Sequence, residues 1–115
     1  MKDTITYIAG PISGRLETYE REFAAAAQHL KDLGAIVLNP SMLPIGLKSH
    51  QSYMNICLPM LREAEAIVML PGWQESTGAR MEFDEARRIG MPVWHFVHHP
   101  VHGTAPVLEV MHHGQ

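Results

Sequence analysis

Several features that mark particular classes of protein are scarce in this sequence. Cysteine occurs once in 115 residues, as Cys57, which excludes an intrachain disulfide and a four-cysteine zinc site. Nine Lys and Arg stand against twelve Asp and Glu, for a formal net charge of −3, and this balance argues against a protein that binds a nucleic acid polymer. No apolar run approaches the roughly 20 residues that cross a bilayer, and the polar N-terminus does not resemble a signal peptide. These absences predict a soluble, cytoplasmic protein without membrane contacts.

What the chain does contain is enough apolar sequence for a core, since 46% of its residues are hydrophobic. We predict one domain over residues 1–97. Short apolar segments typical of strands occupy residues 4–9, 35–38, 66–70 and 92–97, and helical periodicity covers residues 17–33, 51–64 and 76–89. Because apolar strands alternate with helices, the pattern predicts an α/β, Rossmann-like three-layer sandwich with a parallel sheet of four or five strands.

Residues 98–115 differ from the rest of the chain in being rich in histidine. Five of the eight histidines lie there: His98, His99, His102, His112 and His113. Imidazole is a common metal ligand, but the spacing of these residues defines no ligand geometry, so we predict no metal site. We expect a His-rich tail that is mobile or forms a contact with a neighbouring subunit.

A ligand site is expected in the turn-rich segments at residues 10–15, 39–49 and 71–78, because ligands of open parallel sheets bind at the carboxyl ends of the strands. Glycines let a backbone approach a ligand closely, and an arginine can pair with an anion. An ordinary strand-to-helix turn with a solvated arginine fits the first segment equally well. Its candidate binding residues are Gly10, Pro11, Ser13, Gly14 and Arg15.

The third segment runs into a predicted helix, whose free N–H groups form an anion site. Its candidate binding residues are Gly72, Trp73, Ser76 and Gly78. Glu82 shares a helical face with Phe83 and Ala86, so its side chain is predicted to point toward the sheet. A buried, unpaired carboxylate costs several kcal/mol, which favours a catalytic task for Glu82 over a structural ion pair or a peripheral position.

Tyr7 belongs to the first predicted strand. If the first and third strands are neighbours, Tyr7 lies next to Glu82, and its hydroxyl can hold the carboxylate in position. Packing in the core with a satisfied hydroxyl is the alternative for this residue.

Three motifs in this order carry a resemblance to a known group of proteins: YIAGPISG at residues 7–14, LNP at 38–40 and MLPGWQESTGARMEFDEA at 69–86. Together they resemble the nucleoside 2-deoxyribosyltransferase-like superfamily, and its DUF4406 branch in particular, over roughly residues 4–97. The resemblance implies a flavodoxin-like fold, a homo-oligomer (dimer or higher), and no metal or other cofactor. It also implies a small-molecule nucleoside or nucleotide as the partner.

The resemblance further implies roles for single residues. Glu82 matches the nucleophile of this superfamily and Tyr7 the tyrosine that orients it, while Ser76 and Gly78 match residues that bind a 5′-phosphate. Asn39 of the LNP motif is a further candidate for substrate binding. Cys57 and Glu65 occupy positions where characterised members carry aspartates, and Pro11 and Ser13 replace a serine and an arginine of the phosphate-binding hydrolases.

We therefore hypothesise cleavage of the N-glycosidic bond of a 2′-deoxynucleoside or its 5′-monophosphate, by a hydrolase or a deoxyribosyltransferase. A neighbouring subunit is expected to complete the site, because so small a sheet offers little wall around a cleft. Two alternatives stay open. Cys57 in place of an aspartate suits a nucleotide-binding module without catalysis, and the segment PGWQESTGARME at residues 71–82 is loosely similar to a loop of ribonucleotide phosphoribohydrolases.

Overall fold

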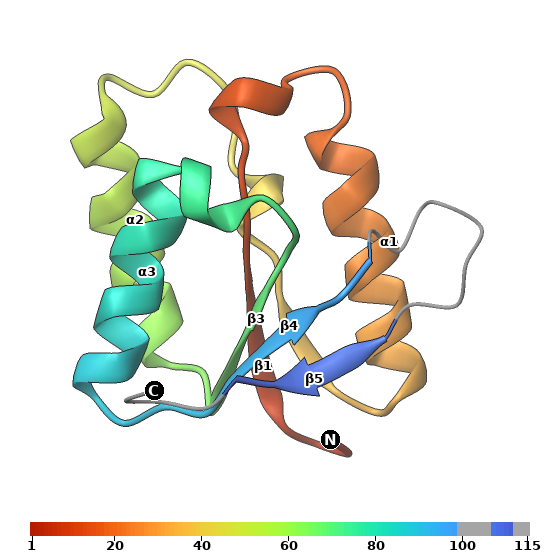
Figure 1. Ribbon diagram of the computed structural model, residues 1–115. Helices are drawn as coiled ribbons and strands as arrows, with labels where there is room; N and C mark the ends of the chain where they lie inside the picture. Colours follow the sequence, from red (N-terminus) through yellow and green to blue (C-terminus); the bar gives the residue numbers. More distant parts are fainter. Residues whose placement is uncertain (99–106, 112–115) are drawn as a thin grey trace.

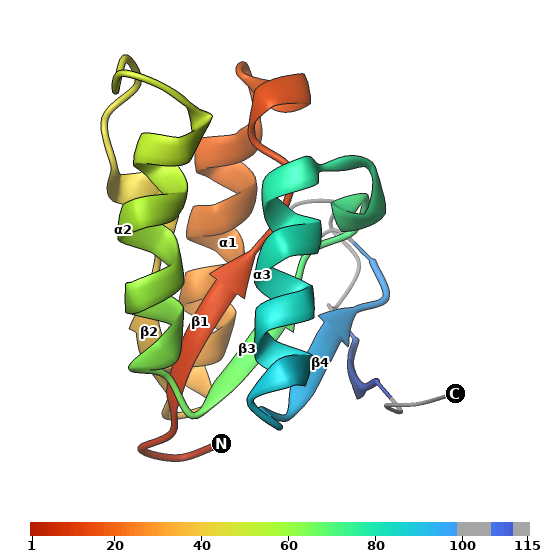
Figure 2. The ribbon, with the colours of Figure 1, turned by 90° about the vertical axis from the view of Figure 1, so that its left-hand side faces the viewer.

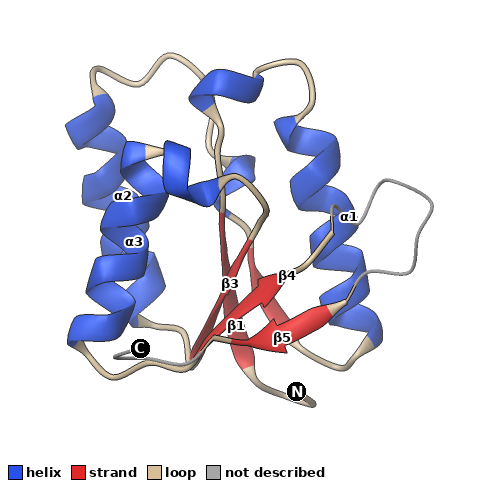
Figure 3. Ribbon diagram, viewed as in Figure 1, coloured by secondary structure: helices blue, strands red, loops and turns tan. Residues whose placement is uncertain are grey.

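The apolar segments form a five-stranded sheet in the computed structural model, which describes residues 1–98 and 107–111 (Figure 3). The strand order is β2-β1-β3-β4-β5. Strands β1 to β4 run parallel, and β5 is antiparallel to β4. The strands span Ile5–Ala9 (β1), Ile36–Leu38 (β2), Ala66–Met69 (β3), Val93–Phe96 (β4) and Leu108–Val110 (β5). The predicted α/β class is confirmed, with one antiparallel strand added at an edge.

Two sequence predictions about the sheet are corrected by this arrangement. The boundary predicted at residue 97 leaves out β5, which pairs with β4 through Phe96 and Leu108. The apolar composition of segment 35–38 is typical of a buried, interior strand, but β2 lies at the edge of the sheet and pairs with β1 alone, so Ile36 is 52% exposed. His99, His102, His112 and His113 lie outside the described residues, so what we expect of them stays a prediction.

Helices cover both faces of the sheet. Helix α1 (Tyr19–Asp32) lies on one face, and α2 (His50–Arg62) and α3 (Thr77–Arg88) lie on the other (Figures 1 and 2). Successive side chains of a strand point to opposite faces, so Ile8 packs with Phe23 of α1 while Tyr7 packs with Leu61 of α2. Within residues 1–98 and 107–111, none of the helices is long and apolar enough to cross a membrane.

The strand order reverses direction between β1 and β3. In the sheet, β2 lies on one side of β1, whereas β3 and then β4 lie on the other side. A short 3₁₀ turn follows each of the first three strands: η1 (Ser13–Arg15), η2 (Pro40–Met42) and η3 (Trp73–Glu75). The three segments predicted to hold a site therefore lie together at the carboxyl ends of the parallel strands, which we call the ligand edge of the sheet. They lie next to the switch point where open α/β sheets bind ligands.

Candidate active site

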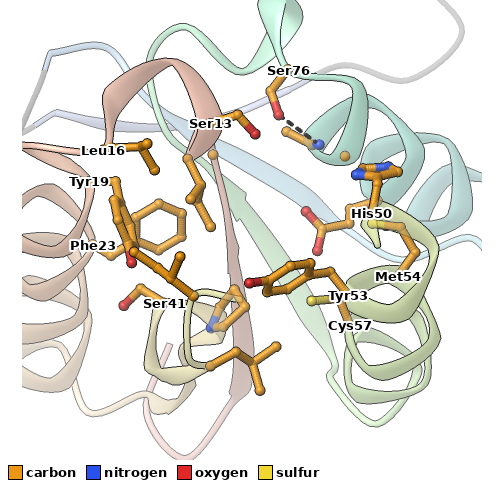
Figure 4. Close-up of a pocket in the computed structure, with 18 of the residues that line it drawn as sticks. Ser13, Leu16, Tyr19, Phe23, Ser41, His50, Tyr53, Met54, Cys57 and Ser76 are labelled. Atoms are coloured by element: carbon orange, nitrogen blue, oxygen red, sulfur yellow. Dashed lines mark hydrogen bonds between the residues drawn. The ribbon is translucent and has the colours of Figure 1, made fainter. Parts of the chain in front are cut away.

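A cavity of about 290 Å³ lies at this edge of the sheet (Figure 4). Leu16, Tyr19 and Phe23 line one side of it, and residues of α2 line the opposite side. The loop that follows β2 and the first two turns of α3 complete the wall. Its volume is near the lower end of the range for small-molecule sites, about 300–1,000 Å³.

Glu82 and Tyr7 meet at the base of this cavity. Glu82 lines the cavity from α3 but is only 6% exposed, and Tyr7 on β1 is fully buried. The Tyr7 hydroxyl donates a hydrogen bond to Oε2 of Glu82. The predicted contact between the two residues is confirmed, because β1 pairs with β3 and Tyr7 points to the face that α3 covers. Their catalytic roles stay predictions.

Burial sets the protonation of this pair. Loss of water raises the pKa of Glu82 to about 7, against the opposing effect of the hydrogen bond from Tyr7. Burial, and then the charge of Glu82, raise the pKa of Tyr7 far above its usual range. Tyr7 therefore stays protonated as a donor, while Glu82 changes charge near neutral pH.

Cys57 lies beside this pair. It lines the cavity from α2 and is 7% exposed. Burial raises the pKa of its thiol, and the charge of Glu82 adds to this effect. The side chain that stands where the resemblance places an aspartate is therefore a neutral thiol at neutral pH.

A second, more polar pocket of about 510 Å³ adjoins the cavity at the start of α3. Ser13, Ser76, Gly78 and His50 line both spaces, and Figure 4 shows Ser13, Ser76 and His50 at one end of the cavity. The second pocket is also lined by residues that do not reach the first cavity: Pro11, Gly14, Arg15, Glu75 and Thr77. The free N–H groups at a helix start favour an anion here.

The charges around the second pocket partly offset one another. Arg15 forms an ion pair with Glu22 of α1, with 2.9 Å between Nη1 and Oε2. Glu75 brings a carboxylate to the same pocket. Arg15 is thus held in place by a buried partner, and the pocket is less positive than the sequence alone implied.

Two predicted binding residues, Glu65 and Asn39, line neither pocket in the described part of the chain. Glu65 is at the amino end of β3, exposed, and its Oε1 accepts a hydrogen bond from the Ile5 N–H at 2.9 Å. A four-residue strand is about 13 Å long, so Glu65 lies at the opposite edge of the sheet. Asn39 uses its Oδ1 to accept the Ser41 N–H at 3.0 Å, which caps η2. The structure brings neither residue into the lining of a pocket, and their binding roles stay predictions.

Trp73 and Gly72 also line neither pocket within the described part of the chain, so their binding roles stay predictions. The Trp73 ring packs on Phe83, with 4.5 Å between centroids. Gly72 lies behind Arg15, since a β-carbon there would be 2.7 Å from Nη2 of Arg15. Gly72 therefore makes room for the arginine.

Sequence reasoning missed His50 and Tyr53, which both line the cavity from the first turn of α2. A β-carbon at Gly78 would lie 3.3 Å from Cε1 of His50, so the two helix starts meet closely. The signal that pointed to them was the position of helix 51–64 directly after the second loop. The amino end of that helix had to lie at the ligand edge, where polar residues of its first turn face the site.

Comparisons with known proteins agree with this architecture. The family model DUF4406, described as a domain of unknown function, matches residues 4–95. A solved structure of a 2-deoxyribosyltransferase from the psychrotolerant bacterium Bacillus psychrosaccharolyticus is similar, with a TM-score of 0.60 and 22% identity over 77% of this chain and 69% of that one. No curated protein matches the sequence. The structural likeness confirms the flavodoxin-like fold that the motifs implied.

Proposed function

The chain belongs to the DUF4406 family, and from this premise we propose that it cleaves the N-glycosidic bond of a 2′-deoxynucleoside or its 5′-monophosphate. One observation carries the proposal. The carboxylate of Glu82 is buried in the wall of a cavity of about 290 Å³ and accepts a hydrogen bond from a buried tyrosine. Among the described residues that line this cavity, no other carries a carboxylate. The fold shared with a 2-deoxyribosyltransferase supports the same chemistry.

In the proposed first step, Oε1 of Glu82 bonds to C1′ of the sugar and the C1′–N bond breaks, with its electron pair going to the base. The base nitrogen takes a proton from solvent as it leaves. Tyr7 holds Oε2, which fixes the orientation of the carboxylate for attack. The transition state resembles an oxocarbenium ion, so the negative charge of Glu82 also stabilises it.

In the proposed second step, water attacks C1′, the ester bond to Glu82 breaks and the carboxylate is regenerated. The water supplies the proton that balances the one gained by the base. Transfer differs only in that a second base replaces water. We take hydrolysis as the first reaction to test.

The second pocket supports a phosphate on the substrate. Ser13, Ser76 and His50 surround the start of α3, where backbone N–H groups favour an anion. Glu22 and Glu75 oppose that preference. We propose that the helix start outweighs these carboxylates, so that a 5′-monophosphate binds more tightly than its nucleoside. The ratio of the two KM values measures the difference.

We also propose that the protein acts as a homo-oligomer. Leu16 and Ile45 line the cavity yet are 60% and 68% exposed, and Met42, in the segment that leads to Ile45, is 84% exposed. A second subunit over this mouth would cover apolar surface and exclude water from the reaction. Sedimentation analysis of the wild-type protein tests this, and a monomer at micromolar concentration contradicts it.

The reaction is tested with a panel of 2′-deoxynucleosides, their 5′-monophosphates and the corresponding ribonucleotides, with free base measured by chromatography. We expect release from at least one deoxy compound, and a loss of about 10³-fold or more in Glu82→Gln. Asp84→Asn is the matched control, because Asp84 is an exposed carboxylate on the same helix. Release that Glu82→Gln leaves unchanged contradicts the proposal, and a preference for ribonucleotides indicates a phosphoribohydrolase.

A nucleotide-binding module without turnover is the second candidate, and Cys57 favours it. A thiol whose pKa is raised by burial is a poor acid for the departing base. Tight binding of a deoxynucleoside monophosphate without release of free base selects this alternative.

A further inference from the structure

The turn at residues 44–47 is held by a single side chain from another element. The Tyr53 hydroxyl on α2 donates a hydrogen bond to the Pro44 carbonyl at 2.8 Å. It also accepts hydrogen bonds from the N–H groups of Gly46 at 3.0 Å and Leu47 at 3.4 Å. One phenol thus satisfies three backbone groups of the same turn.

The turn has little else to fix it. Pro44, Ile45 and Gly46 are exposed, and Gly46 has a φ of 102°, which a residue with a side chain rarely adopts. An exposed turn with few buried contacts opens easily. The hydrogen bonds of Tyr53 therefore decide where this segment lies.

Position matters here because the turn forms part of the cavity wall. Leu43, Pro44 and Ile45 line the cavity. In Figure 4, Tyr53 extends from α2 across the cavity toward the side of Ser41, with Tyr19 and Phe23 on the far side. An apolar part of the cavity is thus enclosed between this turn and α1, away from the end that holds Ser13, Ser76 and His50.

The two ends suit the two parts of a nucleotide. The polar end, next to the start of α3, suits a phosphate. The apolar end, with two aromatic side chains and no charged one among its described residues, suits the flat faces of a heteroaromatic ring. We propose that Tyr53 is a positioning residue that holds turn 44–47 as the wall against which the base binds. The inference rests on the proposed function.

Removing one oxygen tests the first half of the inference. Tyr53→Phe keeps the ring and abolishes all three hydrogen bonds. Amide exchange of Gly46 and Leu47, followed by NMR in the free protein, is expected to become about tenfold faster. Tyr19→Phe is the matched control, because it removes the same atom from another ring of the cavity, and the hydrogen bonds of the turn are made by Tyr53 and not by Tyr19. It is expected to leave these two rates unchanged.

Ligand binding tests the second half, in the Glu82→Gln background so that no ligand is consumed. We expect Tyr53→Phe to weaken 2′-deoxyadenosine 5′-monophosphate about tenfold, and to change the affinity for base-free 2-deoxyribose 5-phosphate less than about twofold. A merely structural role would weaken both alike. Gly46→Ala perturbs the turn without touching α2, since a β-carbon there meets no atom within 4 Å, and it should reproduce the selective loss.

Each result has one meaning. Unchanged exchange at Gly46 and Leu47 overturns the role of Tyr53. Faster exchange with unchanged affinity for the base-containing probe shows that the base binds elsewhere and also overturns the inference. If neither probe binds any variant, the proposed function fails, while the exchange rates still decide whether Tyr53 holds the turn.

Discussion

The base of the cavity and its wall at turn 44–47 are built in different ways. Tyr7 and Glu82 belong to a central strand and a packed helix, and both are buried. Turn 44–47 is exposed and depends on the hydroxyl of Tyr53. Groups that perform chemistry must be held to within a fraction of an ångström, whereas a wall that binds a flat ring tolerates movement. Under the proposed function, this difference leads us to expect that reaction and substrate choice depend on separate parts of this small domain.

The largest expected effect concerns the stability of the protein and comes from Glu82 at the buried base of the cavity. Glu82 has a pKa of about 7 in the folded protein, above its ordinary value of 4.5. The folded state therefore holds a proton that the unfolded state releases, so this group favours folding at acidic pH and loses that contribution as pH rises from about 4.5 through 7. Glu82→Gln should stabilise the protein relative to wild type by an amount that grows to about 3 kcal/mol at pH 8.

Urea unfolding of both proteins between pH 4 and pH 8 measures this difference. Asp84→Asn, on the exposed side of the same helix, serves as the control and should show little pH dependence relative to wild type. A constant difference between Glu82→Gln and wild type across this range would mean that Glu82 is not desolvated.

The next effect is on catalysis and comes from Tyr7, also at the base of the cavity. Tyr7→Phe removes the hydrogen bond that lowers the pKa of Glu82, so the carboxylate loses both its orientation and a stabilising donor. We expect kcat/KM to fall about 10- to 100-fold. In the wild type, kcat/KM should rise with pH through about 7, as Glu82 ionises, and Tyr7→Phe should move this midpoint upward.

Initial rates across the pH range measure both effects. Tyr53→Phe also removes a phenol oxygen, but at turn 44–47. It should raise KM while leaving the midpoint of the pH profile in place. If Tyr7→Phe and Tyr53→Phe change kcat, KM and the pH midpoint in the same way, the base of the cavity and turn 44–47 do not have separate roles.

The smallest effect is expected at turn 44–47. Gly46→Ala introduces a side chain at a φ of 102°, which costs about 1 kcal/mol when the turn keeps its shape and less when the turn opens. The free energy of unfolding should therefore fall by about 1 kcal/mol or less, as measured by urea titration. A loss as large as that of a core substitution would show that the turn is part of the cooperative core.

Much of the site was predictable from the sequence because it depends on local periodicity. The helical spacing of Glu82 with Phe83 and Ala86 indicated an inward carboxylate. The position of Tyr7 on the first strand indicated a contact with Glu82 on the condition that the first and third strands are neighbours, which they are. Glu65 was a candidate because its position matches that of an aspartate in characterised members, and such a match does not say at which end of the strand the residue lies. A residue just before a parallel strand lies at the amino end, a full strand length from the ligand edge.

His50 and Tyr53 were not predictable as site residues for a different reason. Their role depends on the start of α2 meeting α3 and turn 44–47, which are contacts between separate elements. Tyr53 has the same helical spacing as residues that pack in the core, so periodicity alone does not distinguish a packed ring from one whose hydroxyl holds a turn.

The sequence by itself determined the order of strands and helices, the ligand edge of the sheet and the inward face of α3, because alternation and periodicity are properties of neighbouring residues. Tertiary structure decided the position of β5, the ion pair of Arg15 with Glu22 and the protonation of Glu82. These depend on which distant segments exclude water from a group or supply its partner. A pKa of about 7 for Glu82 exists only once β1, α2 and α3 have closed around it.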